Sequence, residues 1–180
     1  MAGIVDINEG RRRLAAKKGF APWSRRFGTS FNENTSIRSL DNPVIGYLVR
    51  GNEDSAMALY ELIMAIKGLG PGPRFHYLDS RSKMCVTDIT LLLLDLVRFE
   101  AMYRLGWIDD YPFLNVPLVD IIGNFKDRFS AASNDSPVLS RSHPLYTEYL
   151  SEYESDRNVF VRKLIPDAIK TFCNDALQLE

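Results

Sequence analysis

Cysteine and histidine, which build most disulfides, metal sites and catalytic centres, are scarce in this sequence. Its two cysteines, Cys85 and Cys173, stand far apart, and neither belongs to a C-x-x-C pair or lies close to a histidine. This spacing excludes a disulfide-built scaffold and the common zinc patterns. The apolar neighbours of both thiols favour buried side chains in a reducing compartment. We therefore expect a cytoplasmic protein with no metal and no cofactor.

Long apolar runs are also lacking. The longest segment without a charged residue covers residues 111–119, whereas a membrane-spanning helix needs about 20 apolar residues. The first residues are followed by charged ones rather than by the apolar core of a secretory signal. We expect no membrane contact and no export.

The common signatures of enzymes are missing as well. The chain contains no nucleophile elbow, zinc-protease pattern, dinucleotide-binding glycine pattern or kinase set. The glycine-rich segment 68–73 lacks the ending of a phosphate-binding loop, and its prolines remove amide donors, so we interpret it as a turn. These absences favour a binding role over catalysis and leave an enzyme as an alternative.

What the sequence does contain is apolar material for one packed core. Hydrophobic residues make up 46% of the chain and charged residues 25%, which is ordinary for a globular domain. Apolar side chains recur three and four residues apart in residues 52–68, 87–105, 115–129 and 144–177, as on one face of a helix. We predict an all-α protein, an irregular helical bundle or orthogonal helical array of about five to six helices.

Particular residues mark the expected helix ends. Asn52 and Asn115 are good N-caps, because the side-chain oxygen can accept a free backbone N–H. Gly68 is a typical C-terminal stop. Pro166 must kink or restart the last helix, since proline removes a backbone donor. The segment 144–164 before it is predicted to be one long amphipathic helix.

Charge is distributed unevenly along the chain. Residues 1–40 carry eight basic and three acidic groups, whereas the remainder carries 14 basic and 20 acidic groups. We interpret residues 1–42 as an extended basic aromatic arm, free or packed on the body, and residues 43–180 as a single helical domain. Within the arm, a short polar helix is expected at residues 8–18, with Gly19 as its stop.

The arm is the most distinctive candidate binding segment. Its candidate partner-binding residues combine cations with large rings: Arg25, Arg26, Trp23, Phe20 and Phe27. Exposed rings are costly unless covered, so an arm packed over the acidic body of its own chain is the preferred interpretation. Docking to a protein partner comes next. Nucleic acid comes last, because no helix-turn-helix or zinc-finger pattern accompanies the cations.

A second candidate site lies beside the predicted central helix. Asp88, Asp95 and Arg98 share one stripe of an otherwise apolar helix, and His76 precedes it as a possible pocket edge. A charge in such a helix must reach water, pair, or line a polar cavity. The spacing of Asp95 and Arg98 favours a structural ion pair over a ligand site. His76 has no nucleophile or metal ligand beside it, which favours a place at the rim of the core.

The segment around residues 146–160 carries two further patterns. Acids recur every four residues at Glu148, Glu152 and Asp156, and we interpret them as a solvated helix face rather than a metal site. The opposite face is an apolar stripe rich in tyrosine, a residue enriched at protein interfaces. Its members are Tyr146, Tyr149, Leu150, Tyr153 and Phe160. We therefore predict a homodimer or higher oligomer.

Together these patterns favour a non-catalytic protein-interaction or regulatory helical domain, whose partner is another protein or a second copy. The alternative is an all-helical small-molecule-binding protein or enzyme with a polar cavity beside the central helix. Nucleic-acid binding through the basic arm is the third hypothesis. No pattern in the sequence identifies the partner or the ligand.

Overall fold

The computed structural model describes residues 7–130 and 136–177, and the chain there is mostly helical, with only isolated β-bridges. The predicted all-α helical array is confirmed. Five α-helices in the described residues have ten or more residues: α1 (Ile7–Phe27), α3 (Glu53–Lys67), α4 (Ser80–Arg104), α7 (Glu154–Lys163) and α8 (Ile165–Leu177). Shorter helical elements join them: η1 (Ile37–Ser39), α2 (Asn42–Leu48), η2 (Gly72–Tyr77), α5 (Leu118–Gly123), η3 (Phe125–Phe129) and α6 (Tyr146–Ser151). Residues 1–6 of the predicted arm lie outside the described residues.

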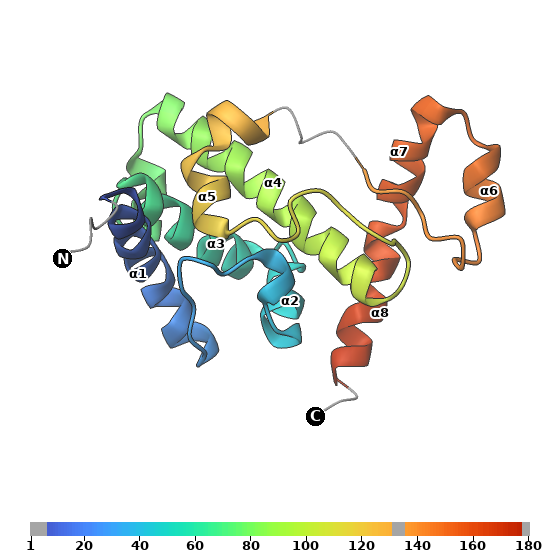
Figure 1. Cartoon of the computed structure of the whole chain (residues 1–180), viewed down its shortest axis with the longest axis horizontal. Coiled ribbons are helices and arrows are strands. Elements are labelled where there is room, and N and C mark those ends of the chain that lie inside the picture. Colours follow the sequence, from blue (N-terminus) through green and yellow to red (C-terminus); the bar gives the residue numbers. More distant parts are fainter. Residues whose placement is uncertain (1–6, 131–135, 178–180) are drawn as a thin grey trace, which may run out of the picture.

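Helix α4 crosses the middle of the molecule, and the other helices are arranged around it (Figure 1). Helices α1 and α3 pack together at one end, α2 and α8 pack against α4, and α6 and α7 project at the other end (Figure 1). The buried apolar side chains form one continuous cluster from α1 to α8. None of the helices in the described part of the chain is long and apolar enough to cross a bilayer.

Both ends of α3 and the end of α4 lie where the sequence predicts them, but α4 starts earlier. The Asn52 side chain accepts the N–H of Ser55 at 2.9 Å, and Gly68 follows α3 with a left-handed φ of 69°. Helix α4 begins seven residues before the predicted Thr87, at Ser80. Its first turn is polar, so apolar periodicity does not reveal it. The Asp79 side chain caps it by accepting a backbone N–H at 3.0 Å.

Helix α1 departs from the predicted arm, because it continues through Gly19 instead of stopping there. Residues 19–27 are therefore helical rather than extended. A Cβ atom at Gly19 would lie only 2.9 Å from the Leu62 Cδ1 atom, so the missing side chain allows α1 to approach α3 closely. The Trp23 indole N–H then donates to the Ala58 carbonyl of α3 at 2.7 Å. This packing outweighs the roughly 1 kcal/mol by which glycine weakens a helix.

The predicted long helix before Pro166 is instead a hairpin. Residues 152–153 are extended and separate α6 from α7. This break lets the rings of Tyr149 and Phe160 pack at a centroid distance of 5.8 Å. Eleven residues of straight helix would separate them by about 16 Å. Burial of these rings therefore favours the hairpin, while Pro166 lies in the first turn of α8, as a restart requires.

The α-helix predicted for residues 115–129 is also shorter than expected. Asn115 is not an N-cap, because α5 begins only at Leu118, after Pro117. The Leu118 N–H donates to the Thr35 carbonyl at 2.8 Å, which holds this start against the segment after α1. A π-helical turn then completes the predicted helix, so its apolar stripe is preserved in two pieces.

Truncation of Trp23 tests whether α1 belongs to the core. Trp23→Ala should lower the free energy of unfolding by about 3–5 kcal/mol, because it removes a side chain that is 1% exposed together with its hydrogen bond. Lys17→Ala, on the exposed face of the same helix, should change it by less than about 0.5 kcal/mol. Urea unfolding followed by circular dichroism measures both. Equal effects would contradict the docking of α1.

Candidate functional site

The four residues predicted to line a ligand cavity are not gathered around one hollow. Asp88 is exposed on α4, and His76 is exposed on η2. His76 borders a hollow of about 330 Å³ between α3 and η2, which Asp88, Asp95 and Arg98 do not line. Asp95 and Arg98 do lie together on α4, and both are half-buried. Of the four predicted residues, Asp95 and Arg98 are the two that the described contacts bring together.

Asp95 forms its shorter ion pair with another helix. The Arg162 Nη1 atom of α7 lies 2.9 Å from Asp95 Oδ2, whereas Arg98 Nη1 lies 3.9 Å from Asp95 Oδ1. Arg98 packs over Gly51, with Nη2 3.1 Å from the position of a Cβ atom there. Burial lowers the pKa of Arg98, and the Asp95 carboxylate opposes that change. Asp95 thus connects the base of α7 to the central helix.

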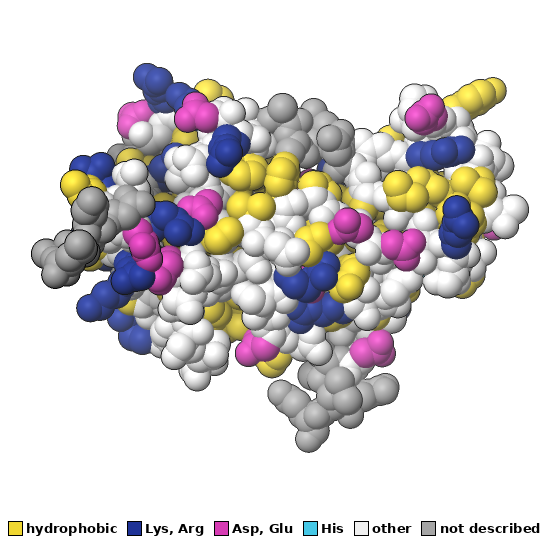
Figure 2. Space-filling model, viewed as in Figure 1, with side chains coloured by type: hydrophobic (Ala, Val, Ile, Leu, Met, Phe, Trp, Pro, Cys, Tyr) yellow, Lys and Arg dark blue, Asp and Glu magenta, His cyan; other side chains and the backbone are white. Residues whose placement is uncertain are grey.

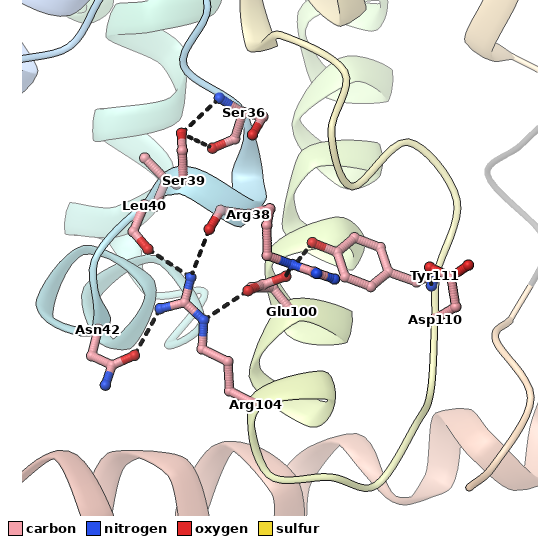
Figure 3. A network of polar contacts seen from close by, with 9 residues as sticks. All are labelled: Ser36, Arg38, Ser39, Leu40, Asn42, Glu100, Arg104, Asp110 and Tyr111. Atoms are coloured by element: carbon pink, nitrogen blue, oxygen red, sulfur yellow. Dashed lines mark hydrogen bonds and ion pairs between the residues drawn. The ribbon is translucent and has the colours of Figure 1, made fainter.

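The most buried charge in the described residues is one that the sequence patterns did not reveal. Glu100 of α4 is 0% exposed, and Arg38, Arg104 and Tyr111 converge on its carboxylate (Figure 3). Arg38 Nε lies 3.0 Å from Oε2 and Arg104 Nε lies 2.7 Å from Oε1. The Tyr111 hydroxyl donates to the same carboxylate. The one sequence pattern that could have indicated this network is the spacing of four residues between Glu100 and Arg104, which allows an ion pair along a helix.

The same network ties backbone from distant segments to α4. The Arg104 guanidinium also donates to the Leu40 carbonyl at 2.6 Å and to Asn42 Oδ1 at 2.7 Å (Figure 3). The Arg38 guanidinium stacks over the Tyr103 ring at 3.8 Å. Burial, followed by the hydrogen bond to Glu100, raises the pKa of Tyr111. Because these contacts occupy the carboxylate of Glu100, its role is structural and it is not open to a ligand.

Metal coordination finds no support in residues 7–130 and 136–177, where no group of three or more His, Cys, Asp or Glu side chains is arranged to hold an ion. Glu148, Glu152 and Asp156 are separated by the hairpin, because they belong to α6, to the extended break and to α7 respectively. All three are exposed. They are solvated as expected, but not on the single helix face that their spacing predicted.

The aromatic residues of the arm lie within the fold of their own chain. Phe20 and Trp23 are fully buried, and Phe27 packs edge-on against Tyr47 at 5.2 Å. Arg26 forms an ion pair with a glutamate of α3 at 2.9 Å. Arg25, in contrast, is exposed and has no ion pair among the described residues. Of the five candidate partner-binding residues, Arg25 presents the freest charge.

The outward side of α1 carries a basic stripe, here called the α1 outer face: Arg11, Leu14, Lys18 and Arg25. Their spacing places them opposite the buried Trp23 on the helix. Leu14 is 53% exposed, and the three cations have no ion pair within the described part of the chain. Lys and Arg side chains are visible along this end of the molecule (Figure 2).

The α6–α7 hairpin, residues 146–163, projects from the opposite end (Figure 1). Three apolar side chains on it are unusually open: Leu150 is 46% exposed, Tyr153 82% and Val159 51%. Hydrophobic atoms are visible on this end beside charged ones (Figure 2). Four carboxylates are exposed around them: Glu148, Glu152, Glu154 and Asp156.

The hairpin is held in shape by contacts between its own helices. Arg157 Nη2 donates to the Leu150 carbonyl at 3.1 Å, and its guanidinium stands over the Tyr149 ring at 5.5 Å. At the base, His143 Nδ1 accepts the N–H of Leu145 at 3.1 Å. The open side chains are thus presented on an ordered support.

Removal of the buried charge tests the central network. Glu100→Gln should lower the free energy of unfolding by about 3–5 kcal/mol, because it leaves Arg38 and Arg104 without their carboxylate. Asp88→Asn, an exposed change on the same helix, should alter it by less than about 0.5 kcal/mol. Chemical denaturation compares the two variants. A neutral Glu100→Gln would show that the network contributes no net stability.

The turn before α6 should be sensitive to acid. Burial lowers the pKa of His143 below its ordinary value of 6.5, so the unfolded chain takes up a proton first as the pH falls. The stability linked to His143 is therefore present above pH 6.5 and lost below it. Proton NMR titration, with the resonance assigned by a His76→Gln variant, should give the lowered pKa. A His143 pKa at or above 6.5 would contradict this environment.

Two surfaces at opposite ends of the molecule therefore remain as candidate sites, the α6–α7 hairpin and the α1 outer face. The first carries four exposed carboxylates and open apolar side chains beside Arg157, Arg162 and Lys163, and the second is basic with one open leucine. No protein-family model, no curated protein and no solved structure matches the chain.

Proposed function

We propose that this chain is a non-catalytic protein-interaction domain that docks a partner protein through the α6–α7 hairpin. The main support is the exposure of Leu150, Tyr153 and Val159 on an ordered projection. Open apolar side chains grouped on a surface favour contact with another macromolecule, because water solvates them poorly. Tyrosine suits such a place, since its ring can be buried while its hydroxyl stays in contact with water.

The order of the hairpin favours binding. Arg157 closes it onto the Leu150 carbonyl, and Tyr149 packs against Phe160. The Asp95–Arg162 pair connects its base to α4. A partner would therefore meet a preformed surface and would not have to order a loose loop, which reduces the entropic cost of association.

The charges of the hairpin favour a basic partner surface. Glu152 and Glu154 flank Tyr153 directly in the sequence, and both are exposed. An apolar centre with a polar rim is the usual arrangement of a docking surface. Carboxylates on such a rim attract a cationic surface and disfavour an anionic one, so they select the partner and accelerate its approach.

Paired substitutions test the role of the hairpin. We expect Tyr153→Ser with Val159→Ser to lose a protein that the full chain retains from an extract of its host, because both apolar contacts disappear. Tyr77→Ser with Leu91→Ser removes two exposed apolar side chains elsewhere and is the matched control. Chemical cross-linking with mass spectrometry should map the partner to residues 146–163. Thermal melting should stay unchanged in both variants.

Equal retention by the hairpin variant and by the full chain would contradict the proposal. Cross-links that fall outside residues 146–163 would contradict it too, because the partner would then use another surface. Self-association is one form of the proposed interaction, so the mass of each variant in solution belongs to the same test.

A further inference from the structure

We infer that the hairpin docks onto the α1 outer face of a second copy of this chain, with Tyr153 entering the hollow beside Lys18 and Arg25. This inference rests on the proposed docking function of the hairpin and names its partner. The tip of the hairpin around Tyr153 is acidic and the α1 outer face is basic, and each contains exposed apolar atoms among its charges.

The receiving surface is a hollow as well as a charged face. Lys18 and Arg25 border a depression of about 490 Å³ between α1 and the glycine-proline segment that follows α3. Its walls include Pro22 of α1 and the prolines at positions 71 and 73 of the segment after α3. Glu61, the acid that also borders it, already pairs with Arg26 at 2.9 Å. The hollow therefore offers apolar walls and two cations without an ion pair among the described residues.

The hairpin carries the complementary arrangement at its tip. Tyr153 is 82% exposed and stands in the extended break between α6 and α7. Its neighbours Glu152 and Glu154 are exposed carboxylates. A ring between two anions matches an apolar hollow between two cations, because ring burial and both charge pairs can form together.

The placement of the two surfaces determines the kind of assembly. The α1 outer face and the hairpin lie at opposite ends of the long axis (Figure 1). One molecule therefore cannot close the contact on itself. A single head-to-tail contact leaves one surface of each kind free at the ends and permits longer chains, whereas two copies side by side in opposite directions form both contacts in a twofold dimer.

Nucleic acid is the competing occupant of the α1 cations, and the observations favour a protein. Bases stack on exposed rings, yet Phe20 and Trp23 are buried in the core of their own chain. Proline walls beside Lys18 and Arg25 suit an apolar side chain. A strand of phosphates would use the cations and leave these walls without a role.

The test uses two complementary variants of the full chain. The hollow variant is Lys18→Gln with Arg25→Gln, and the tip variant is Glu152→Gln with Tyr153→Ser and Glu154→Gln. The unmodified chain should exceed its monomer mass of 20.5 kDa as concentration rises, and should return to that mass in high salt. Each variant alone should weaken the association by about tenfold or more.

Mixing provides the decisive measurement. An equimolar mixture of the two variants retains one intact hollow and one intact tip, so light scattering should show a dimer that does not grow further. Arg81→Gln with Lys126→Gln removes two exposed cations outside α1 and should assemble like the unmodified chain. Circular dichroism melts of all variants should coincide, since every substituted side chain is exposed.

Several results would overturn the inference. They are a chain that stays at 20.5 kDa at every concentration and salt level, assembly that survives in both variants, and a mixture that fails to form dimers. A monomeric chain that binds a labelled RNA or DNA strand through Lys18 and Arg25 would assign the cations to nucleic acid instead. A monomer whose hairpin still retains another protein would overturn this inference and leave the proposed function standing. A chain that neither self-associates nor retains another protein through the hairpin would overturn both the inference and the proposed function.

Discussion

The buried carboxylate of Glu100 constrains more of this structure than any other polar group in the described residues. An ionised group that is 0% exposed must be paired, because an unpaired buried charge costs several kcal/mol. Arg38 and Arg104 supply the pairing charges, and Tyr111 supplies a hydroxyl. Because Arg38 comes from η1 and Tyr111 from the segment after α4, satisfying one carboxylate fixes two stretches of backbone against the central helix.

Charges on the central helix thus act as connections between helices. Arg104, paired with Glu100, holds the segment that leads into α2, and Asp95 reaches Arg162 at the base of α7. The predicted Asp95–Arg98 pair is the longer of the two contacts of Asp95. Apolar packing positions the helices broadly, and these ion pairs specify how the hairpin sits on α4, which is the property that a docking element needs.

The continuity of α1 has a functional consequence as well as a structural one. Arg11, Lys18 and Arg25 line up on one side only because the helix runs through Gly19 without a break. The same helix buries Trp23 on its inner side. One element therefore contributes rings to the core and cations to the surface, and the candidate partner-binding residues of the predicted arm are divided between these two roles.

The sequence by itself determined the elements whose apolar period is long and whose ends carry capping residues. Asn52 and Gly68 bound α3, and the dense apolar run from residue 89 marks α4 as the central helix. The tertiary structure decided the rest: Gly19 stays helical because Leu62 lies against it, the chain breaks after α6 because Tyr149 meets Phe160, and Asp95 pairs with Arg162, which is 67 residues away. The physical reason is that the period of apolar side chains shows which face of a segment is buried, whereas the group that covers this face comes from a distant part of the chain.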